Sequence, residues 1–215
     1  MEADHRQRWR RLASRHRAIA VIRTSTVAQG IAMAQAVAQA GLHLIEITWN
    51  SEQPDYLIEH LAAALPDCTV GAGTLQTSAD VERAIAVGAQ FCFSPHTDSA
   101  LIDLANQAGI PFIPGALTPT EIVRAWQAGA ACVKVFPITA VGGAAYLRAL
   151  RGPLGHIPLL PTGGVTRLNV ADLLTSGAIA VGLSSALFPQ QTLKRQDWLA
   201  ITDNARELYQ ITRQL

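Results

Sequence analysis

Two charged residues stand inside apolar runs whose composition is typical of buried strands. Lys134 lies in the run Val-Lys-Val-Phe, residues 133–136, and Glu46 lies in the run Ile-Glu-Ile-Thr, residues 45–48. A buried charge needs a partner, a solvated pocket or a neutral state. A lysine amine can also condense with a ketone to form an imine, and a nearby carboxylate can move protons. The two residues therefore predict either covalent chemistry on a carbonyl compound or a structural ion pair.

The lysine content favours the first interpretation. Lys134 and Lys194 are the only lysines in the chain, although arginine is frequent. Arginine does not form imines under mild conditions, whereas lysine does. Burial among apolar neighbours is expected to make the neutral, nucleophilic amine of Lys134 accessible. The alternative is that Lys134 snorkels out of a strand end or pairs with a carboxylate.

The elements around these residues follow a repeating pattern of strand and helix. Apolar runs predict eight strands, at residues 18–22, 44–48, 69–72, 91–94, 111–114, 132–136, 158–161 and 179–182. Ala-rich or amphipathic stretches predict helices between them, the first three at 27–40, 55–65 and 79–87. Eight evenly spaced units predict an α/β protein, a single compact (β/α)8 TIM barrel over residues 1–215. Residues 1–17 are expected to form an extra N-terminal helix over one end, and 196–215 a final helix. A doubly wound open sheet is the alternative.

Composition restricts the kinds of partner. The net charge is +1, so nucleic acid is not an expected partner, and we interpret the arginine-rich residues 1–17 as a covering helix. No apolar run approaches the length of a bilayer span, and the N-terminus lacks the apolar core of a secretory signal. The three cysteines show no CxxC spacing, which favours reduced thiols in the cytoplasm.

The expected site lies where the strands end, because barrel chemistry takes place at their C-terminal ends. Gly163 and Gly164 follow the seventh expected strand, and Ser184 follows the eighth. Backbone N–H groups and a hydroxyl at these two positions can cradle a phosphate. The alternative is that these residues form ordinary tight turns.

Six motifs, taken together and in order, resemble those of the 2-keto-3-deoxy-6-phosphogluconate (KDPG) / 4-hydroxy-2-oxoglutarate (KHG) aldolase family. They are Ile45-Glu46-Ile47-Thr48, Val70-Gly71-Ala72-Gly73-Thr74, Phe93-Ser94-Pro95, Ile113-Pro114-Gly115, Val133-Lys134-Val135-Phe136-Pro137 and Pro161-Thr162-Gly163-Gly164-Val165. The resemblance covers almost the whole chain. It implies a compact (β/α)8 barrel that assembles as a homotrimer and uses no metal or organic cofactor.

The resemblance also implies roles for individual residues. Lys134 falls on the imine-forming lysine and Glu46 on the acid/base glutamate. The substrate-binding positions fall on Thr74, near the keto-acid carboxylate, and on Pro95, Phe136, Gly163, Gly164 and Ser184. Asn50 departs from the pattern, because the phosphogluconate enzymes typically carry arginine there. Arg23, at the end of the first expected strand, is then the candidate that supplies positive charge to a carboxylate or phosphate.

The function implied is a class I (Schiff-base) aldolase, a lyase of the Entner-Doudoroff type. It would cleave KDPG to pyruvate and glyceraldehyde 3-phosphate, 4-hydroxy-2-oxoglutarate to pyruvate and glyoxylate, or both. Asn50 leaves open the phosphogalactonate epimer, since that branch carries Leu-Asn-Ser where this chain has Trp49-Asn50-Ser51. Oxaloacetate decarboxylation through the same Lys134 imine is another alternative. A barrel that binds a phosphometabolite without turnover is the non-enzymatic one.

Overall fold

The computed structural model describes residues 2–214, and side chains from residue 5 onward. Met1 and Leu215, which fall in the expected first and last helices, lie outside the described residues. The strands are β1 (Ala18–Ile22), β2 (Leu44–Thr48), β3 (Thr69–Gly73), β4 (Cys92–Phe93), β5 (Phe112–Ile113), β6 (Gly115–Ala116), β7 (Val133–Val135), β8 (Leu159–Pro161) and β9 (Val181–Leu183). The α-helices are α1 (Glu2–His16), α2 (Val27–Gln39), α3 (Pro54–Ala64), α4 (Ser78–Ala86), α5 (Ser99–Gln107), α6 (Pro119–Gln127), α7 (Ala144–Leu154), α8 (Val170–Thr175), α9 (Gln190–Arg195) and α10 (Trp198–Arg213). A 3₁₀ turn, η1, spans Ile138–Val141.

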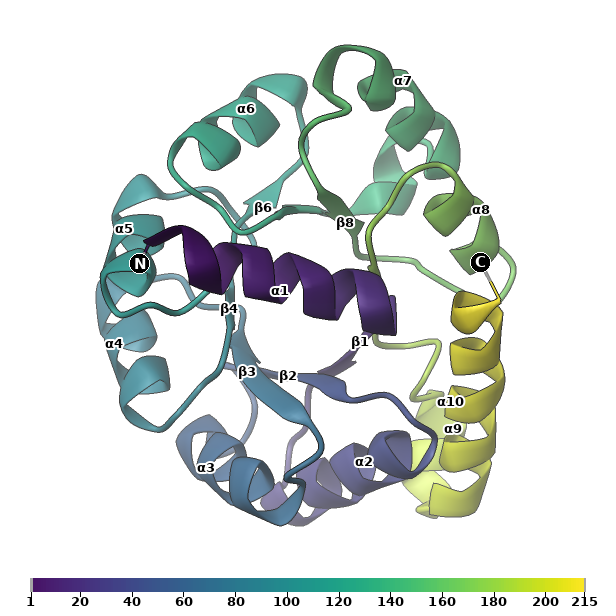
Figure 1. Cartoon of the computed structure of the whole chain (residues 1–215). Helices are drawn as coiled ribbons and strands as arrows, with labels where there is room; N and C mark the ends of the chain where they lie inside the picture. The colour runs from purple at the N-terminus through teal and green to yellow at the C-terminus, as the bar shows by residue number, and fades with distance from the viewer. Residues whose placement is uncertain (1, 215) are drawn as a thin grey trace.

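The strands form a curled parallel sheet in an α/β fold. They curl around a centre, with the helices that connect them on the outside (Figure 1). The ladders have the orders β5-β4-β3-β2-β1-β9 and β6-β7-β8, and each of their pairings is parallel. Such a sheet is buried on both faces, which explains the apolar runs of the sequence.

The expected fifth strand, residues 111–114, is divided differently in the structure. β5 and β6 flank Pro114, which has no backbone N–H to donate to a ladder. The sequence therefore predicted eight strands where the structure has nine. Between the two ladders, the Ala131 N–H donates to the Phe112 carbonyl at 2.9 Å, and the Ile179 N–H donates to the Leu159 carbonyl at 3.0 Å.

Alternation along the strands determines which side chains face the centre. Leu44 belongs to an inner apolar cluster, whereas Ile45 and Ile47 belong to the cluster between strands and helices. Since successive side chains of a strand point to opposite faces, Glu46 points inward with Leu44. The same alternation on β7, between inner Cys132 and outer Val133, turns Lys134 inward.

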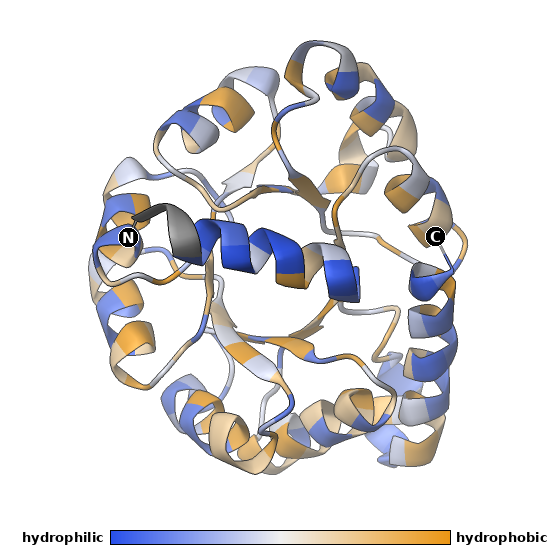
Figure 2. Cartoon of the chain, in the orientation of Figure 1, coloured by the Kyte–Doolittle hydropathy of each residue, from blue (hydrophilic) through white to orange (hydrophobic). Residues whose placement is uncertain are grey.

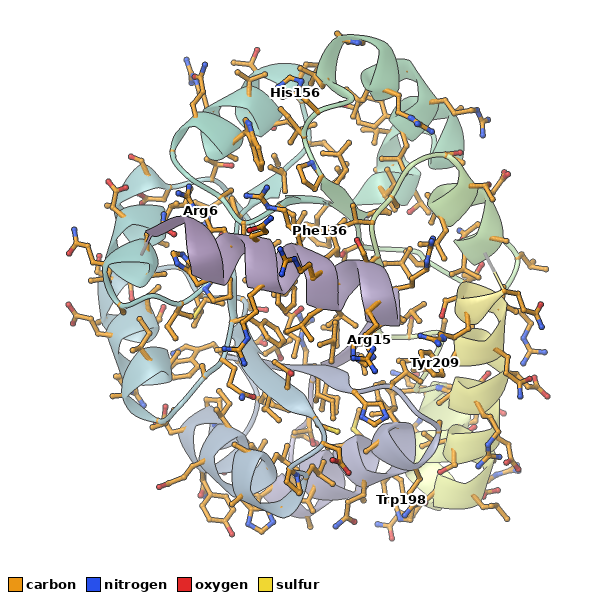
Figure 3. The ribbon with its side chains drawn as sticks, in the orientation of Figure 1. Arg6, Arg15, Phe136, His156, Trp198 and Tyr209 are labelled. Carbon is orange, nitrogen blue, oxygen red and sulfur yellow. The ribbon has the colours of Figure 1, made fainter. Side chains whose placement is uncertain are left out.

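Helix α1 lies across one end of the curled sheet in Figure 1. Its Trp9 is 1% exposed, and the Arg10 Nε donates to the Ala131 carbonyl at 2.9 Å. From residue 5 to residue 16, α1 is largely hydrophilic (Figure 2), as expected for a helix with one face in solvent. Helix α10 lies at the rim, where Figure 3 labels Trp198 and Tyr209.

The last expected helix, 196–215, begins slightly later than predicted. Asp197 is the N-cap of α10, and its side chain accepts a hydrogen bond from the Ala200 N–H at 3.1 Å. Over the part of the chain that the structure describes, no helix has the length and apolarity needed to cross a bilayer.

Candidate active site

A cavity of about 360 Å³ opens at the C-terminal ends of the strands. Its walls include Arg23, Glu46, Thr74, Pro95, Lys134, Phe136, Gly163, Gly164 and Ser184. These are the predicted site residues with one exception, Asn50, which is exposed and is not part of the wall. The structure thus brings together residues that are distant in the sequence, from the ends of β1 to β9.

Glu46 projects from β2 into this cavity and is 1% exposed. Burial raises the pKa of its carboxyl group, while the charges of Lys134 and Arg23 act in the opposite direction. Its Oε1 atom has no hydrogen-bond partner among the described residues. A carboxyl group with a raised pKa and a free oxygen is suited to accept and return a proton near neutral pH.

Gly73, at the end of β3, makes room for this carboxyl group. A Cβ atom at position 73 would overlap Glu46 Oε1. The next residue, Thr74, has a φ of +63°, a conformation that β-branched residues rarely adopt. Backbone strain of this kind concentrates at functional sites. The end of β3 and the loop after it thus leave room for the Glu46 carboxyl group, at the cost of backbone strain at Thr74.

Lys134 projects from β7 and is 6% exposed. Its Nζ lies 5.4 Å from the centroid of the Phe93 ring and 5.3 Å from that of Phe136. Both Lys134 and Glu46 are described, and they form no ion pair within 4.0 Å of each other. The structural ion pair that the sequence left open is not formed, and aromatic faces are the neighbours that attract the ammonium.

The turn after β8 is made of two glycines with positive φ that line the cavity. Gly163 and Gly164 have φ values of +89° and +80°, which favour glycine. Their carbonyls accept hydrogen bonds from Thr139 Oγ1 at 3.2 Å and Asn169 Nδ2 at 2.9 Å, respectively. These bonds fix the turn through its carbonyl groups beside Ser184, which lines the same cavity.

Arg23 follows β1 on a loop that is tied to the loop after β2. The Thr24 N–H donates to Ser51 Oγ at 3.2 Å, and Ser51 Oγ lies 3.1 Å from Thr48 Oγ1. All three polar side chains are buried. The Glu52 N–H also donates to the Thr24 carbonyl at 3.0 Å. These contacts hold the backbone next to Arg23 against the strand that carries Glu46.

A sequence model described as "KDPG and KHG aldolase" matches residues 11–204. The chain belongs to the KDPG and KHG aldolase family. This confirms the resemblance drawn from the motifs, and it makes the chain a member of a family of lyases.

Individual relatives support the same assignment. A 2-dehydro-3-deoxy-phosphogluconate aldolase of Dickeya dadantii is 34% identical over 189 residues, 88% of this chain and 89% of that protein. A probable 2-dehydro-3-deoxy-6-phosphogalactonate aldolase of Rhizobium meliloti is 36% identical over 172 residues, 79% of this chain and 81% of that protein. The KDPG aldolase of Legionella pneumophila, solved with pyruvate captured as a covalent carbinolamine, superposes with a TM-score of 0.86. It is 28% identical, and the match covers 93% of this chain and 97% of that one.

Two residues close to Lys134 or in the cavity wall of this KDPG and KHG aldolase family member were given no role from the sequence. Thr162 lines the cavity, is 8% exposed and has an Oγ1 without a hydrogen-bond partner among the described residues. It stands in the Pro161–Val165 motif, so its position was visible although no role was given to it. Phe93 stands in the Phe93-Ser94-Pro95 motif, but no role was predicted for it, because an aromatic residue in an apolar strand is typical of a core.

Among the residues that the structure describes, no three His, Cys, Asp or Glu side chains are grouped so that they could hold a metal ion. The three cysteines are buried and free, at positions 68, 92 and 132. Burial raises the pKa of Cys92 and of Cys132 to about 12. Their thiols are therefore protonated at neutral pH and are not nucleophiles.

Proposed function

We propose that this chain is a class I aldolase that cleaves KDPG to pyruvate and glyceraldehyde 3-phosphate, 4-hydroxy-2-oxoglutarate to pyruvate and glyoxylate, or both. One observation carries the proposal. Lys134 and Glu46 line the same cavity, and neither is consumed by an ion pair with the other. The family membership and the pyruvate carbinolamine of the Legionella enzyme support it.

The first half of the reaction forms an imine. The neutral amine of Lys134 attacks the C2 ketone of the 2-keto acid, and the ketone oxygen leaves as water, with one proton from the amine and one from solvent. The resulting iminium carries a positive charge on the former Nζ atom. This charge withdraws electrons from the bond between C3 and C4, which is the bond that must break.

The second half uses Glu46 as an acid/base. The carboxylate takes the proton of the C4 hydroxyl, directly or through a water, and C4 leaves as an aldehyde. The electrons of the C3–C4 bond remain on the enamine. Protonation of C3 and hydrolysis of the imine then release pyruvate and restore Lys134. The raised pKa of Glu46 suits it to take the proton of the C4 hydroxyl and to return a proton to C3.

The remaining wall residues bind the substrate. Arg23 lies in the cavity wall and supplies positive charge to the carboxylate or the phosphate of the substrate. Asn50 has no charge and cannot take this role. Thr74, Pro95 and Phe136 surround the keto acid. The turn of Gly163 and Gly164, together with Ser184 of the same cavity wall, holds the phosphate of the aldehyde product.

A second candidate substrate is the phosphogalactonate epimer, 2-keto-3-deoxy-6-phosphogalactonate. Asn50 stands where the phosphogluconate enzymes typically carry arginine, and the Rhizobium relative is a probable phosphogalactonate aldolase. The epimers differ at the C4 hydroxyl, which must meet the base. Side chains beside Glu46 therefore decide between them.

We also propose the finer features of the fold. The single backbone bonds between the two ladders support a closed (β/α)8 barrel, one domain over residues 1–215, with α1 as the extra helix over one end. We propose the homotrimer that the family resemblance implies, with Leu168 and Leu199, which are 95% and 72% exposed, as candidates for burial between subunits. Free thiols support a cytoplasmic location.

The test compares two lysine variants on four substrates. Lys134→Arg keeps the positive charge but cannot form the imine, and Lys194→Arg is the matched control at the other lysine. We expect Lys134→Arg to abolish pyruvate release from both phosphosugar epimers, 4-hydroxy-2-oxoglutarate and oxaloacetate, while Lys194→Arg retains it. Wild-type rates measured side by side rank the four substrates. Pyruvate release by Lys134→Arg at the wild-type rate would disprove the proposal.

A further inference from the structure

Three aromatic rings connect α1 to the amine of Lys134 through the interior of the strand ring. Trp9 lies 4.6 Å from Phe91 and 6.0 Å from Phe93, and Phe91 lies 5.5 Å from Phe93, as centroid distances. Phe93 in turn lies 5.4 Å from Lys134 Nζ. The exposed fractions of the three rings are 1% or less. These three rings, Trp9, Phe91 and Phe93, are called the aromatic column below.

We propose that Phe93, supported by Trp9 of α1, is a positioning residue that stabilises the positive charge on the Lys134 nitrogen during the reaction. Phe93 does not line the cavity, so it acts on the substrate only through Lys134. The inference rests on the proposed imine chemistry and gives a role to Phe93, which stands in the Phe93-Ser94-Pro95 motif but is not among the residues that line the cavity.

The lysine nitrogen carries a positive charge at two stages, of which the iminium is the one that the reaction needs. Lys134 is an ammonium before it loses a proton, and it is an iminium after it condenses with the ketone and water leaves. An aromatic face attracts both cations. Unlike a carboxylate, a ring takes no proton and adds no negative charge. It therefore supports the iminium while it leaves Glu46 free for proton transfer.

Hydrogen bonds from α1 fix the position of the aromatic column relative to the segment that carries Lys134. The Trp9 Nε1–H donates to Cys132 Sγ at 3.4 Å, two residues before Lys134 on the same segment. The Arg10 Nε–H donates to the neighbouring Ala131 carbonyl at 2.9 Å. Helix α1 thus contacts both the ring that faces the amine and the chain that carries the amine. We conclude that α1 supports the reacting end of the barrel although it covers the opposite end.

Graded fluorination of the Phe93 ring tests this role, because fluorine removes electron density from the ring face and nearly preserves its shape. Phenylalanines with one to three ring fluorines are placed at position 93, and the same series at Phe112 is the matched control. Phe112 is also fully buried but belongs to the outer cluster. The readout is the fraction of Lys134 that borohydride traps with pyruvate, measured by peptide mass from low to high pH.

We expect each fluorine at position 93 to lower the plateau of trapped iminium, by about three- to tenfold for the last member, since the cation–π attraction is lost. The pH at which trapping begins should move down, because the ammonium is destabilised as well. The Phe112 series should change neither quantity. A Trp9→Leu variant should shift both in the direction of fluorination.

Two outcomes separate the inference from the proposed function. Trapping of wild-type Lys134 with no change across the Phe93 series would overturn the role of Phe93 and leave the aldolase mechanism standing. Failure to trap wild-type Lys134 at all would overturn both. Equal changes in the Phe93 and Phe112 series would show that fluorination acts through packing alone, which also overturns the inference.

Discussion

At the scale of single residues, a substitution of Glu46 should separate imine formation from bond cleavage. Glu46→Gln keeps the shape of the side chain but cannot take the C4 hydroxyl proton. We expect cleavage of the phosphosugar acids to fall by about 10²- to 10⁴-fold, the usual contribution of a general base. Borohydride trapping of pyruvate at Lys134 should still occur. Loss of trapping and cleavage together would show that Glu46 acts in forming the imine.

The same substitution has an effect on stability that depends on pH. The pKa of buried Glu46 is raised above its ordinary value of 4.5, so the folded state binds more protons than the unfolded state above that pH. The wild type therefore loses stability as pH rises from 4.5 through the raised pKa, whereas Glu46→Gln does not. Urea unfolding should show that the free energy of unfolding of the variant rises relative to that of the wild type as pH increases across this window. A constant difference at every pH would contradict the burial argument.

Residues differ in how far their sequence context reveals their role. Lys134 and Glu46 could be predicted because a charge in an apolar strand is costly and needs a reason. Phe93 could not, since an inner aromatic residue and a residue facing a cation look alike in sequence. The unpaired oxygen of Glu46 and the room left by Gly73 depend on the register between β2 and β3, which only the structure gives.

At the scale of elements, the loops after β1 and β2 act as a unit because Ser51 joins them. Ser51→Ala leaves the buried Thr24 N–H without its acceptor, which costs about 1–3 kcal/mol of stability. Because Arg23 is adjacent, we expect the KM for the keto acid to rise more than kcat falls. Steady-state kinetics and urea unfolding measure the two effects.

Thr118→Ala is the control for this variant. It also removes a hydroxyl that accepts from a backbone N–H, in the capping box of α6, and lies outside the cavity wall. It should cost about 1 kcal/mol of stability without changing KM. An unchanged KM in Ser51→Ala would mean that the hydroxyl network does not position Arg23.

The strands and helices near the site were predicted largely because local signals mark them. Strands β1 and β2 begin and end where the apolar runs do, and helix α4 starts one residue before the expected range 79–87. The fifth strand is divided at Pro114 because proline has no backbone N–H to donate. The prediction of one strand over residues 111–114 considered only the apolar pattern. The contact between Thr24 and Ser51 joins two loops, and no local pattern specifies how two loops meet.

At the scale of the whole molecule, the predicted homotrimer can be tested by its mass and by substitutions of exposed residues. Light scattering on the purified protein should give about three times the chain mass of 22.9 kDa. Leu168→Asp and Leu199→Asp add a charge to highly exposed leucines and should not disturb the fold. At least one of them should lower the mass if its leucine is buried between subunits. A wild-type mass of one chain would refute the trimer.

The arrangement of the whole chain was predictable only as far as the repeat is regular. Evenly spaced strand and helix units predicted a parallel sheet with helices outside, and the α/β fold has that arrangement (Figure 1). The junction between β5 and β7 depends on individual backbone hydrogen bonds, such as that from the Ala131 N–H to the Phe112 carbonyl, which composition does not determine. Asn50 is exposed and is not part of the cavity wall, and its place depends on how two loops meet at Ser51.

Mass spectrometry after borohydride reduction with pyruvate tests the central claim most directly. The chain contains two lysines, so the modified peptide identifies the nucleophile without ambiguity. We predict one reduced pyruvate adduct per chain, on the peptide that contains Lys134, and none on the peptide that contains Lys194. An unmodified chain, or an adduct on Lys194 alone, would contradict the account.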